Sequence, residues 1–359
     1  MAKEKHSNSS ALHEKDGVKD PDITNSGAIN ALKKRRQKQP DAKTLISEIT
    51  KGSISALSRA ITLVESSNPN HLEKANDVLK GCLPFANRSI RIGITGVPGV
   101  GKSTFIEALG TYLTEKDSKI AVLAIDPSSS ISKGSILGDK TRMEDLVKTK
   151  NAFIRPSASG DSLGGVARKT RESILLCEAA GFDTIIIETV GVGQSETAVH
   201  SMVDFFLLLK LAGAGDELQG IKRGIIEMAD AIVINKADGD NLKRAKMAKV
   251  EFNRALHLYP PKSSEWAPKV SLCSGLTKTG IAETYELIED YISITKANNY
   301  FFEHRNEQNK FWLLQTIEDR IKSNFYSKPI IKEELNRQIG LIAENKTTPF
   351  AAADYLLKL

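Results

Sequence analysis

The chain has 359 residues, of which 40% are hydrophobic and 26% are charged, which is ordinary for a globular protein with one large core or two smaller ones. The formal net charge is +6, but ten of the 50 Lys and Arg residues and only six of the 44 Asp and Glu residues lie in residues 1–43. The remaining chain is nearly neutral, which argues against a nucleic-acid partner, and no apolar run is long enough to span a membrane.

Residues 1–43 are polar and mix both charges, a composition typical of a disordered tail. The basic cluster from Lys33 to Arg36 fits either a solvated segment or contact with an acidic partner. The tail lacks the apolar stretch of a secretory signal, and its acidic residues argue against a mitochondrial presequence. Three scattered cysteines without a paired motif indicate a reducing compartment, so we expect a cytoplasmic protein.

Helical periodicity begins after the tail. Apolar residues recur at spacings of three and four from Leu45 to Leu83, with an interruption at Asn68-Pro69-Asn70. Residues 44–86 are therefore expected to form an N-terminal helical segment. Residues 281–359 return to the same periodicity and are expected to form a C-terminal helical segment.

Residues 87–280 alternate short β-branched runs with helical patterns. The expected strands are residues 90–95, 119–125, 184–188, 205–209, 231–235 and 269–272. Strands separated by helices predict an α/β fold with a doubly wound, mainly parallel sheet. The ligands of such a sheet bind at the carboxyl ends of its strands, where the polar motifs of this chain lie.

The loop after the first expected strand is rich in glycine. Residues 96–103 read Gly-Val-Pro-Gly-Val-Gly-Lys-Ser, and their position between a strand and a helix is that of a phosphate-binding P-loop. Backbone N–H groups converge on phosphate oxygens in such a loop, Lys102 reaches the outer phosphates, and the Ser103 hydroxyl binds magnesium. The residues expected to contact phosphate are Gly96, Gly99, Val100, Gly101, Lys102, Ser103 and Thr104. The motif predicts binding of a nucleoside triphosphate within a P-loop fold.

A second motif, Asn235-Lys236-Ala237-Asp238, ends another expected strand. In GTP-binding proteins the Asp of this Asn-Lys-x-Asp pattern accepts two hydrogen bonds from guanine, while the Lys stem packs along the ring. Adenine lacks both donors, so the motif selects GTP and GDP. Asp238 as a helix cap is the alternative. The loop Ser274-Gly275-Leu276 is expected to place backbone N–H groups near the guanine O6.

A third motif follows the strand 184–188. Glu188-Thr189-Val190-Gly191 resembles the Asp-x-x-Gly switch of GTPases, with Glu188 as a magnesium ligand and the Gly191 N–H as a γ-phosphate sensor. Val192 stands where a Ras-like enzyme has its water-orienting Gln, and Gln194 cannot be assumed to replace it. Pro98 stiffens the P-loop beside the γ-phosphate. These features predict slow hydrolysis by the isolated protein.

Two acidic residues lie on loops at the same predicted edge of the sheet. Asp126 ends the strand 119–125, and Asp139 follows in Gly138-Asp139-Lys140. Each fits a magnesium or switch role, but each fits a turn former or helix cap equally well.

Together these motifs resemble the MeaB/ArgK GTPases, including the human MMAA type. The resemblance covers nearly all of the chain from about residue 44 to its end. The motifs that carry it are the P-loop with Pro98, Asp126-Pro127-Ser128-Ser129, Gly138-Asp139-Lys140-Thr141-Arg142-Met143, Glu188 to Glu196, Gly215-Asp216-Glu217-Leu218-Gln219-Gly220-Ile221-Lys222, Asn235 to Asp238, and Thr348-Pro349-Phe350-Ala351-Ala352-Ala353. Lys278 departs from the family by replacing a glycine.

The resemblance implies a GTP-hydrolysing chaperone that gates cobalamin loading or protection of an acyl-CoA mutase of the methylmalonyl-CoA mutase type. It implies a magnesium site of Ser103, Asp126, Asp139 and Glu188, and catalytic roles for Lys102, Glu188 and Lys222. Lys222 fits either a partner-positioned catalytic cation or a solvated helix lysine. The resemblance also implies a homodimer through residues 281–359, and it suggests an indirect link to a cobalamin adenosyltransferase.

Two other functions share parts of this pattern. A P-loop kinase of a small molecule or protein, an older label in this family, needs an acceptor site that the switch-like segments do not suggest. A nickel-insertion GTPase carries Cys and His clusters near its nucleotide, and none of the six His residues is spaced for a ligand group with a Cys.

Overall fold

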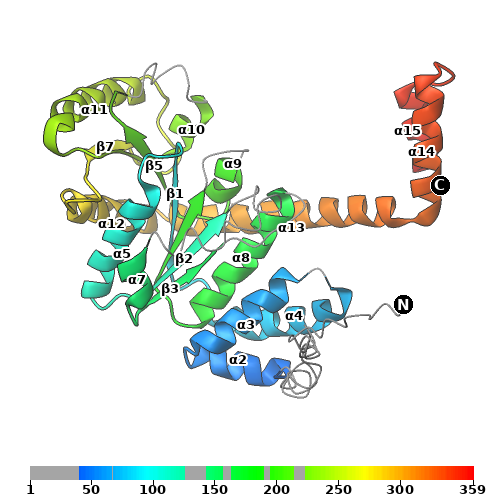
Figure 1. Cartoon of the computed structure of the whole chain (residues 1–359), viewed down its shortest axis with the longest axis horizontal. Helices are drawn as coiled ribbons and strands as arrows, with labels where there is room; N and C mark the ends of the chain where they lie inside the picture. The colour runs from blue at the N-terminus through cyan, green and yellow to red at the C-terminus, as the bar shows by residue number, and fades with distance from the viewer. Residues whose placement is uncertain (1–39, 67, 126–142, 157–162, 190–194, 214–222) are drawn as a thin grey trace, which may run out of the picture. The chain divides into compact units, whose positions relative to one another are not determined.

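The computed structural model describes residues 40–66, 68–125, 143–156, 163–189, 195–213 and 223–359. The elements reported below belong to one compact unit, Ala42–Leu359 (Figure 1). Within the described ranges, no helix is both long enough and apolar enough to cross a membrane.

The centre of this unit is a seven-stranded sheet with the order β3-β2-β4-β1-β5-β6-β7. Every neighbouring pair of strands is parallel. The strands are β1 (Ile90–Gly96), β2 (Ile120–Ile125), β3 (Ala152–Arg155), β4 (Thr184–Thr189), β5 (Phe205–Leu211), β6 (Ala231–Asn235) and β7 (Lys269–Leu272). This confirms the predicted α/β fold with a doubly wound parallel sheet.

Helices connect the strands and extend the chain at both ends. Before the sheet lie α2 (Ala42–Thr50), α3 (Ile54–Glu65), α4 (Pro69–Cys82) and the short η1 (Leu83–Phe85). Between strands lie α5 (Lys102–Glu115), α7 (Glu144–Lys148), α8 (Leu163–Ala179), α9 (Ser195–His200), α10 (Arg223–Met228), η2 (Gly239–Asn241) and α11 (Leu242–Leu256). After the sheet follow α12 (Ile281–Ala297), α13 (Tyr300–Ser327), α14 (Pro329–Ala343) and α15 (Pro349–Leu357).

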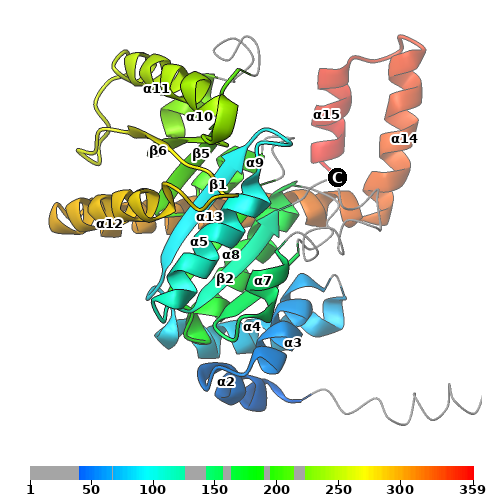
Figure 2. The ribbon, with the colours of Figure 1, turned by 60° about the vertical axis from the view of Figure 1, so that its left-hand side comes forward.

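Helices lie on both faces of the sheet (Figure 2), and the two faces bury separate hydrophobic cores. One face packs against α5, α7 and α12, where Phe105 and Phe205 are fully buried. The other face packs against α8, α9, α10 and α11, and α3 and α4 contact α8 from outside. Because both faces are covered, the strands are nearly continuous apolar runs, as is typical of parallel sheets.

The strand order places β1 in the middle of the sheet, between β4 and β5. The connection from β1 leads to β2 on one side of β1, whereas the connection from β4 leads to β5 on the other side, which makes the carboxyl end of β1 a topological switch point. The loop from β1 to α5 lies at this point, and the carboxyl ends of β4, β6 and β7 lie along the same edge. The motifs of the sequence therefore meet at one edge of the sheet.

The structure differs from the sequence prediction at several elements. Strand β3 was not predicted, because four residues at the sheet edge carry too short a pattern to distinguish from a loop. The N-terminal segment has an additional break at Gly52, whose φ of +81° is a left-handed conformation that favours glycine. Helix α2 begins at Ala42, inside the segment predicted as tail. Most of that tail lies outside the described residues.

Helix α13 is fixed to the sheet domain by buried polar contacts. Arg305 Nε and Nη2 donate to the Asp204 carboxylate at 2.7 and 2.6 Å, and Nη2 also donates to the Ser89 carbonyl at 2.7 Å. Trp312 Nε1 donates to the Ser201 carbonyl at 3.0 Å. Beyond this anchored part, α14 packs against α13, and α15 packs against α14.

Candidate nucleotide-binding site

The glycine loop between β1 and α5 requires glycine for conformational and steric reasons. Gly101 has φ +92°, and a Cβ there would lie 2.8 Å from Asn235 Nδ2. A Cβ on Gly96 would lie 2.6 Å from the Leu209 carbonyl oxygen. Side chains at these positions would displace the loop from β5 and β6, so the glycines set the loop geometry.

Lys102 begins α5 and turns back over the loop. Its Nζ donates to the carbonyls of Gly96 at 2.8 Å and Val97 at 3.3 Å, and the side chain is buried. Val100 is fully buried beneath the loop, whereas Thr104 faces outward. The ammonium group is thus held at the mouth of the loop, at the amino end of α5, where helix N–H groups favour an anion.

Ser103 and Glu188 come from different elements and meet beside this loop. Ser103 Oγ donates to Glu188 Oε1 at 3.4 Å, and Glu188 is buried at the carboxyl end of β4. The next residue of β4, Thr189, donates to Thr95 Oγ1 of β1 at 2.9 Å, which fixes the two strand ends together. A hydroxyl beside a carboxylate is the hard oxygen donor set that suits magnesium.

Four of the predicted site residues lie outside the described residues. They are the predicted metal ligands Asp126 and Asp139, the γ-phosphate sensor Gly191 and the catalytic candidate Lys222. The predicted roles of Val192 and Gln194 also fall there.

Asn235, at the end of β6, joins the P-loop to the loop after β7. Its Nδ2 donates to the Val100 carbonyl at 2.9 Å, and its Oδ1 accepts from the Gly275 N–H at 3.2 Å. Burial raises the pKa of Cys273 to about 12, so this residue stays a thiol and donates to Asn235 Oδ1 at 3.3 Å. Asn235 therefore connects the P-loop to the loop after β7, a role that the motif alone did not predict.

Lys236 and Asp238 follow the buried Asn235 and are more exposed than it is. Lys236, with φ +56°, donates from Nζ to the Gly99 carbonyl at 2.9 Å, so its stem runs across the space between the two loops. Asp238 accepts a hydrogen bond from the Ser274 hydroxyl. Ser274 Oγ in turn accepts from the Thr277 N–H at 3.1 Å. The carboxylate is thus oriented from the side of the Ser274 loop.

The Ser274-Gly275-Leu276 loop packs on the start of α5. A Cβ on Gly275 would lie 3.1 Å from the Phe105 amide nitrogen, so a side chain there would crowd the start of α5. Leu276 is 81% exposed. Lys278, the departure noted above, has φ +60°, which is a conformation that a glycine adopts without strain. The predicted phosphate and base loops therefore converge on one place.

A parallel sheet with a P-loop at its switch point and an Asn-Lys-x-Asp loop beside it defines the class of P-loop GTPases. The model of a protein family described as "Methylmalonyl Co-A mutase-associated GTPase MeaB" matches residues 57–330. The chain belongs to this family, and it is a GTPase. The family resemblance and the GTPase activity predicted from the sequence are thereby confirmed.

Similar proteins span most of the chain. It is 49% identical to a "Putative GTPase" of Caulobacter vibrioides over 88% of this chain and 97% of that protein. It is 45% identical to "GTPase ArgK" of Escherichia coli over 84% of this chain and 91% of that protein. It is 43% identical to the "Methylmalonic aciduria type A homolog, mitochondrial" of Mus musculus over 88% of this chain and 78% of that protein. A crystal structure titled "LAO/AO transport system kinase" superposes with a TM-score of 0.72 at 36% identity, over 88% of this chain and 96% of that one.

Proposed function

We propose that this GTPase is a nucleotide-dependent chaperone that gates cobalamin loading or protection of an acyl-CoA mutase of the methylmalonyl-CoA mutase type. The description of the family as mutase-associated supports a mutase as the partner. The similarity to methylmalonic aciduria type A homologues over most of the chain supports the same assignment. The chemistry is attack of water on the γ-phosphate, and its output is a change of the loops that contact the phosphate.

The observation that carries the nucleotide assignment is the contact of Asn235 with both the P-loop and Gly275. Because one side chain fixes both loops, a base at Asp238 and phosphates at Lys102 would be held at a set distance from each other. In this proposal Asp238 and Lys236 bind guanine, and the Ser274-Gly275-Leu276 loop covers its O6 edge. The residues proposed to hold the phosphates are Gly96, Gly99, Val100, Gly101, Lys102, Ser103, Thr104 and Gly191.

Magnesium is the proposed metal. Ser103 and Glu188 would hold it, because their oxygens lie together beside the P-loop, with Asp126 and Asp139 as further ligands. Bound there, the ion would neutralise charge on the β- and γ-phosphates. Glu188 would also orient the hydroxyl of Ser103, and Lys102 would exchange its loop carbonyls for phosphate oxygens.

Lys222 is the proposed partner-positioned cation, which would stabilise negative charge that develops on the transferred phosphoryl group. Val192 leaves the segment after Gly191 without the usual water-orienting Gln. Hydrolysis would therefore be slow until a mutase positions the catalytic groups.

We also propose a domain organisation and an assembly. A polar tail of residues 1–43 precedes an N-terminal helical segment of residues 44–86, the GTPase domain of residues 87–280 and a dimerisation segment of residues 281–359. Exposed apolar side chains along α13, among them Leu313, Leu314 and Ile321, support a homodimer. A cytoplasmic location is consistent with three unpaired, buried cysteines.

A capture experiment tests the proposed partner. The full chain, loaded with GDP or a non-hydrolysable GTP analogue, is used to capture proteins from its own organism, and the eluate is probed for cobalamin-dependent mutases. We expect a mutase whose recovery depends on the bound nucleotide. Recovery of no mutase, together with phosphate transfer to a small-molecule or protein acceptor, would instead support the kinase assignment.

A further inference from the structure

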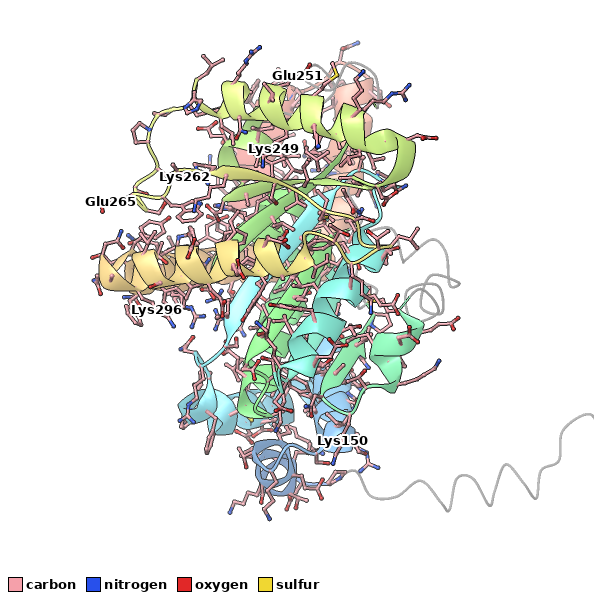
Figure 3. The ribbon with its side chains drawn as sticks, turned by 90° about the vertical axis from the view of Figure 1, so that its left-hand side faces the viewer. Lys150, Lys249, Glu251, Lys262, Glu265 and Lys296 are labelled. Atoms are coloured by element: carbon pink, nitrogen blue, oxygen red, sulfur yellow. The ribbon has the colours of Figure 1, made fainter. Side chains whose placement is uncertain are left out.

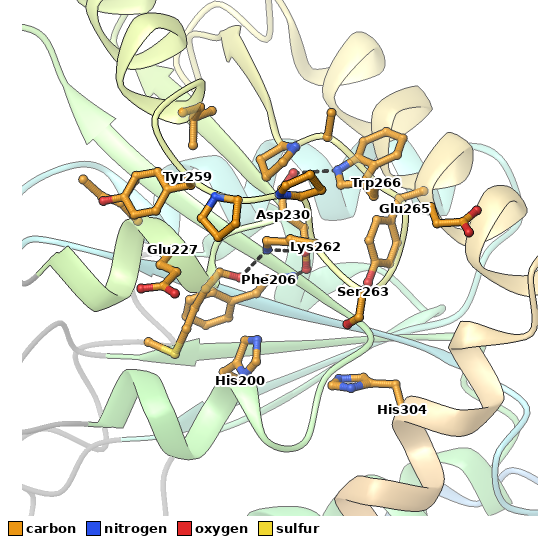
Figure 4. Close-up of a pocket in the computed structure, with 18 of the residues that line it drawn as sticks. His200, Phe206, Glu227, Asp230, Tyr259, Lys262, Ser263, Glu265, Trp266 and His304 are labelled. Atoms are coloured by element: carbon orange, nitrogen blue, oxygen red, sulfur yellow. Dashed lines mark hydrogen bonds and ion pairs between the residues drawn. The ribbon is translucent and has the colours of Figure 1, made fainter.

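A cavity of about 770 Å³ lies at the amino ends of β5 and β6 (Figure 4). Asp204 and Asp230, which directly precede these two strands, both line it. The candidate nucleotide site lies at the carboxyl ends of the strands, about 17 Å away along the five residues from Asp230 to Asn235. The cavity is therefore separate from the site described above.

Helices α9, α10, α12 and α13 contribute His200, Glu227, Tyr291 and His304 to the walls of this cavity. The connection from α11 to β7 also lines it and carries Lys262 and Glu265 beside α12 (Figure 3). The volume of the cavity is typical of a pocket that binds a drug-sized molecule.

Lys262 and Asp230 form an ion pair at the bottom of the cavity. Lys262 Nζ donates to the carbonyls of Met228 and Ala229 at 2.9 and 2.8 Å and to Asp230 Oδ1 at 2.8 Å. Asp230 Oδ2 accepts from the Phe206 N–H at 2.9 Å. Because all three ammonium hydrogens are engaged, Lys262 is not available to bind an anion.

Two of the three histidines that line the cavity, His200 and His304, are neutral at physiological pH. Burial lowers the pKa of His200 to about 4 and also lowers the pKa of His304. His304 Nε2 lies 3.0 Å from Gln308 Nε2. The part of the chain that the structure describes offers the ring nitrogens of His200 no hydrogen-bond partner. Its ring therefore presents one donor and one acceptor that a ligand can use.

The walls are aromatic. Tyr300 stacks on His304 with ring centroids 5.4 Å apart, and Trp266 meets Tyr291 edge-to-face at 5.5 Å. Burial raises the pKa of both tyrosines, so their hydroxyls stay protonated. Such surfaces favour a flat aromatic molecule, which gains stacking energy as well as area burial.

The charges at the cavity disfavour anions. Glu227 and Glu265 line it and are exposed, and among the described residues neither forms an ion pair. Lys262 is the only lysine that the described residues contribute to the lining, and its ammonium group is engaged by Asp230 and two backbone carbonyls. A neutral or cationic ligand therefore fits, and an anionic one such as a nucleotide does not.

From this geometry we infer that the cavity is a second ligand site, which binds a small planar aromatic amine or N–H heterocycle. His200 hydrogen-bonds the ligand, Tyr300 and Trp266 contact its ring, and Glu227 faces its positive charge. Since α9 and α10 both contribute walls, the ligand contacts two helices that are neighbours in the fold.

Three probes with one ring system and different charges test this inference by titration calorimetry on the full chain. They are indole, which is neutral, tryptamine, which is a cation, and indole-3-acetate, which is an anion. We expect saturable binding of tryptamine and of indole, with the anion at least tenfold weaker than tryptamine. Saturating GDP should leave tryptamine binding unchanged, since the two sites are separate.

Two glycine variants provide a matched comparison. Gly224 lines the cavity and Gly340 lies in α14, and a Cβ on either glycine meets no atom within 4 Å. Gly224→Leu should weaken tryptamine binding at least tenfold, while Gly340→Leu should leave it unchanged. His200→Ala should weaken indole binding, with folding checked by circular dichroism. No saturable binding of any probe, equal binding of all three, or equal effects of the two glycine variants would overturn the inference.

Discussion

Asn235 and Asp238 stand three positions apart in one motif, yet their side chains have different surroundings. Asn235 is fully enclosed and bonds to the P-loop carbonyl of Val100 and to the amide of Gly275. Asp238 lies half-buried and accepts from Ser274. The first side chain therefore connects the two loops, and in the proposed function the second selects the base.

Replacing Asp238 tests this division. Asp238→Asn removes the acceptor for both guanine donors and supplies an amide that pairs with the xanthine carbonyl. GTP affinity should fall at least 100-fold, about 3 kcal/mol, and affinity for xanthosine triphosphate should rise. Fluorescent-nucleotide titration measures both affinities. The exposed neighbour Asp240, changed to Asn, is the control and should bind GTP normally. Unchanged GTP affinity in Asp238→Asn would remove the base assignment.

His200 makes stability depend on pH. Its pKa is about 4 in the folded protein because of burial, against about 6.5 for an exposed histidine. Between these values only the unfolded state takes up the proton, so the free energy of unfolding falls as the pH falls from 6.5 to 4. The loss from this residue is up to ~3 kcal/mol.

Urea denaturation at several pH values measures this effect. His200→Gln, which cannot titrate, should lose less stability than the wild type between pH 6.5 and 4. The exposed His257, changed to Gln, should follow the wild-type profile. Parallel profiles for wild type and His200→Gln would show that His200 is not buried as a neutral ring.

At the scale of elements, the sequence was most informative where a motif coincides with a strand end. All six predicted strands are present, and five of them are buried, mainly apolar runs followed by a polar motif or turn; the sixth, β7, is a half-exposed edge strand. Strand β3 was missed because four residues at a sheet edge carry no such signal. The hydrogen bonds of Asn235 to the P-loop and to Gly275 were also not predicted, because the partners of a side chain depend on tertiary contacts. The cavity at the amino ends of β5 and β6 could not be predicted from local sequence, because its lining residues, such as His200 and His304, come from separate helices.

The polar contacts that attach α13 include one buried ion pair. Arg305 donates to both oxygens of Asp204, and both side chains are buried. Arg305→Ala would leave the Asp204 carboxylate buried without its cation, which costs about 3–5 kcal/mol. Urea denaturation should show this loss. Arg337 pairs with Glu334 on the surface at 2.9 Å, so Arg337→Ala is the control. It should lower the free energy of unfolding by less than ~1 kcal/mol. Equal effects would mean that α13 is held mainly by apolar contacts.

At the scale of the whole molecule, α13 presents an apolar stripe that no described part of the chain covers. Leu314, Ile317 and Ile321 follow helical spacing and are 53%, 46% and 63% exposed. A stripe of this kind is typical of an interface between subunits. Its position within residues 281–359 agrees with the proposed homodimer.

The double variant Leu314→Glu/Ile321→Glu should convert the proposed dimer to a monomer, because it places two charges in the proposed interface on each subunit. Light scattering coupled to size-exclusion chromatography reports the mass directly. Met247→Glu, at an exposed apolar position of α11, is the control and should stay dimeric. A variant of unchanged mass, or a monomeric wild type, would place the interface elsewhere.

In the proposed function, a mutase controls the chemistry of this GTPase. The direct measurement is the GTP hydrolysis rate of the full chain, alone and with saturating cobalamin-dependent mutase from the same organism. We expect slow turnover alone and stimulation of at least tenfold by the mutase, and this stimulation should be lost in Lys222→Ala while GTP affinity is kept. A rate that the mutase leaves unchanged, or partner-free turnover near the roughly 10 s⁻¹ of activated GTPases, would contradict it.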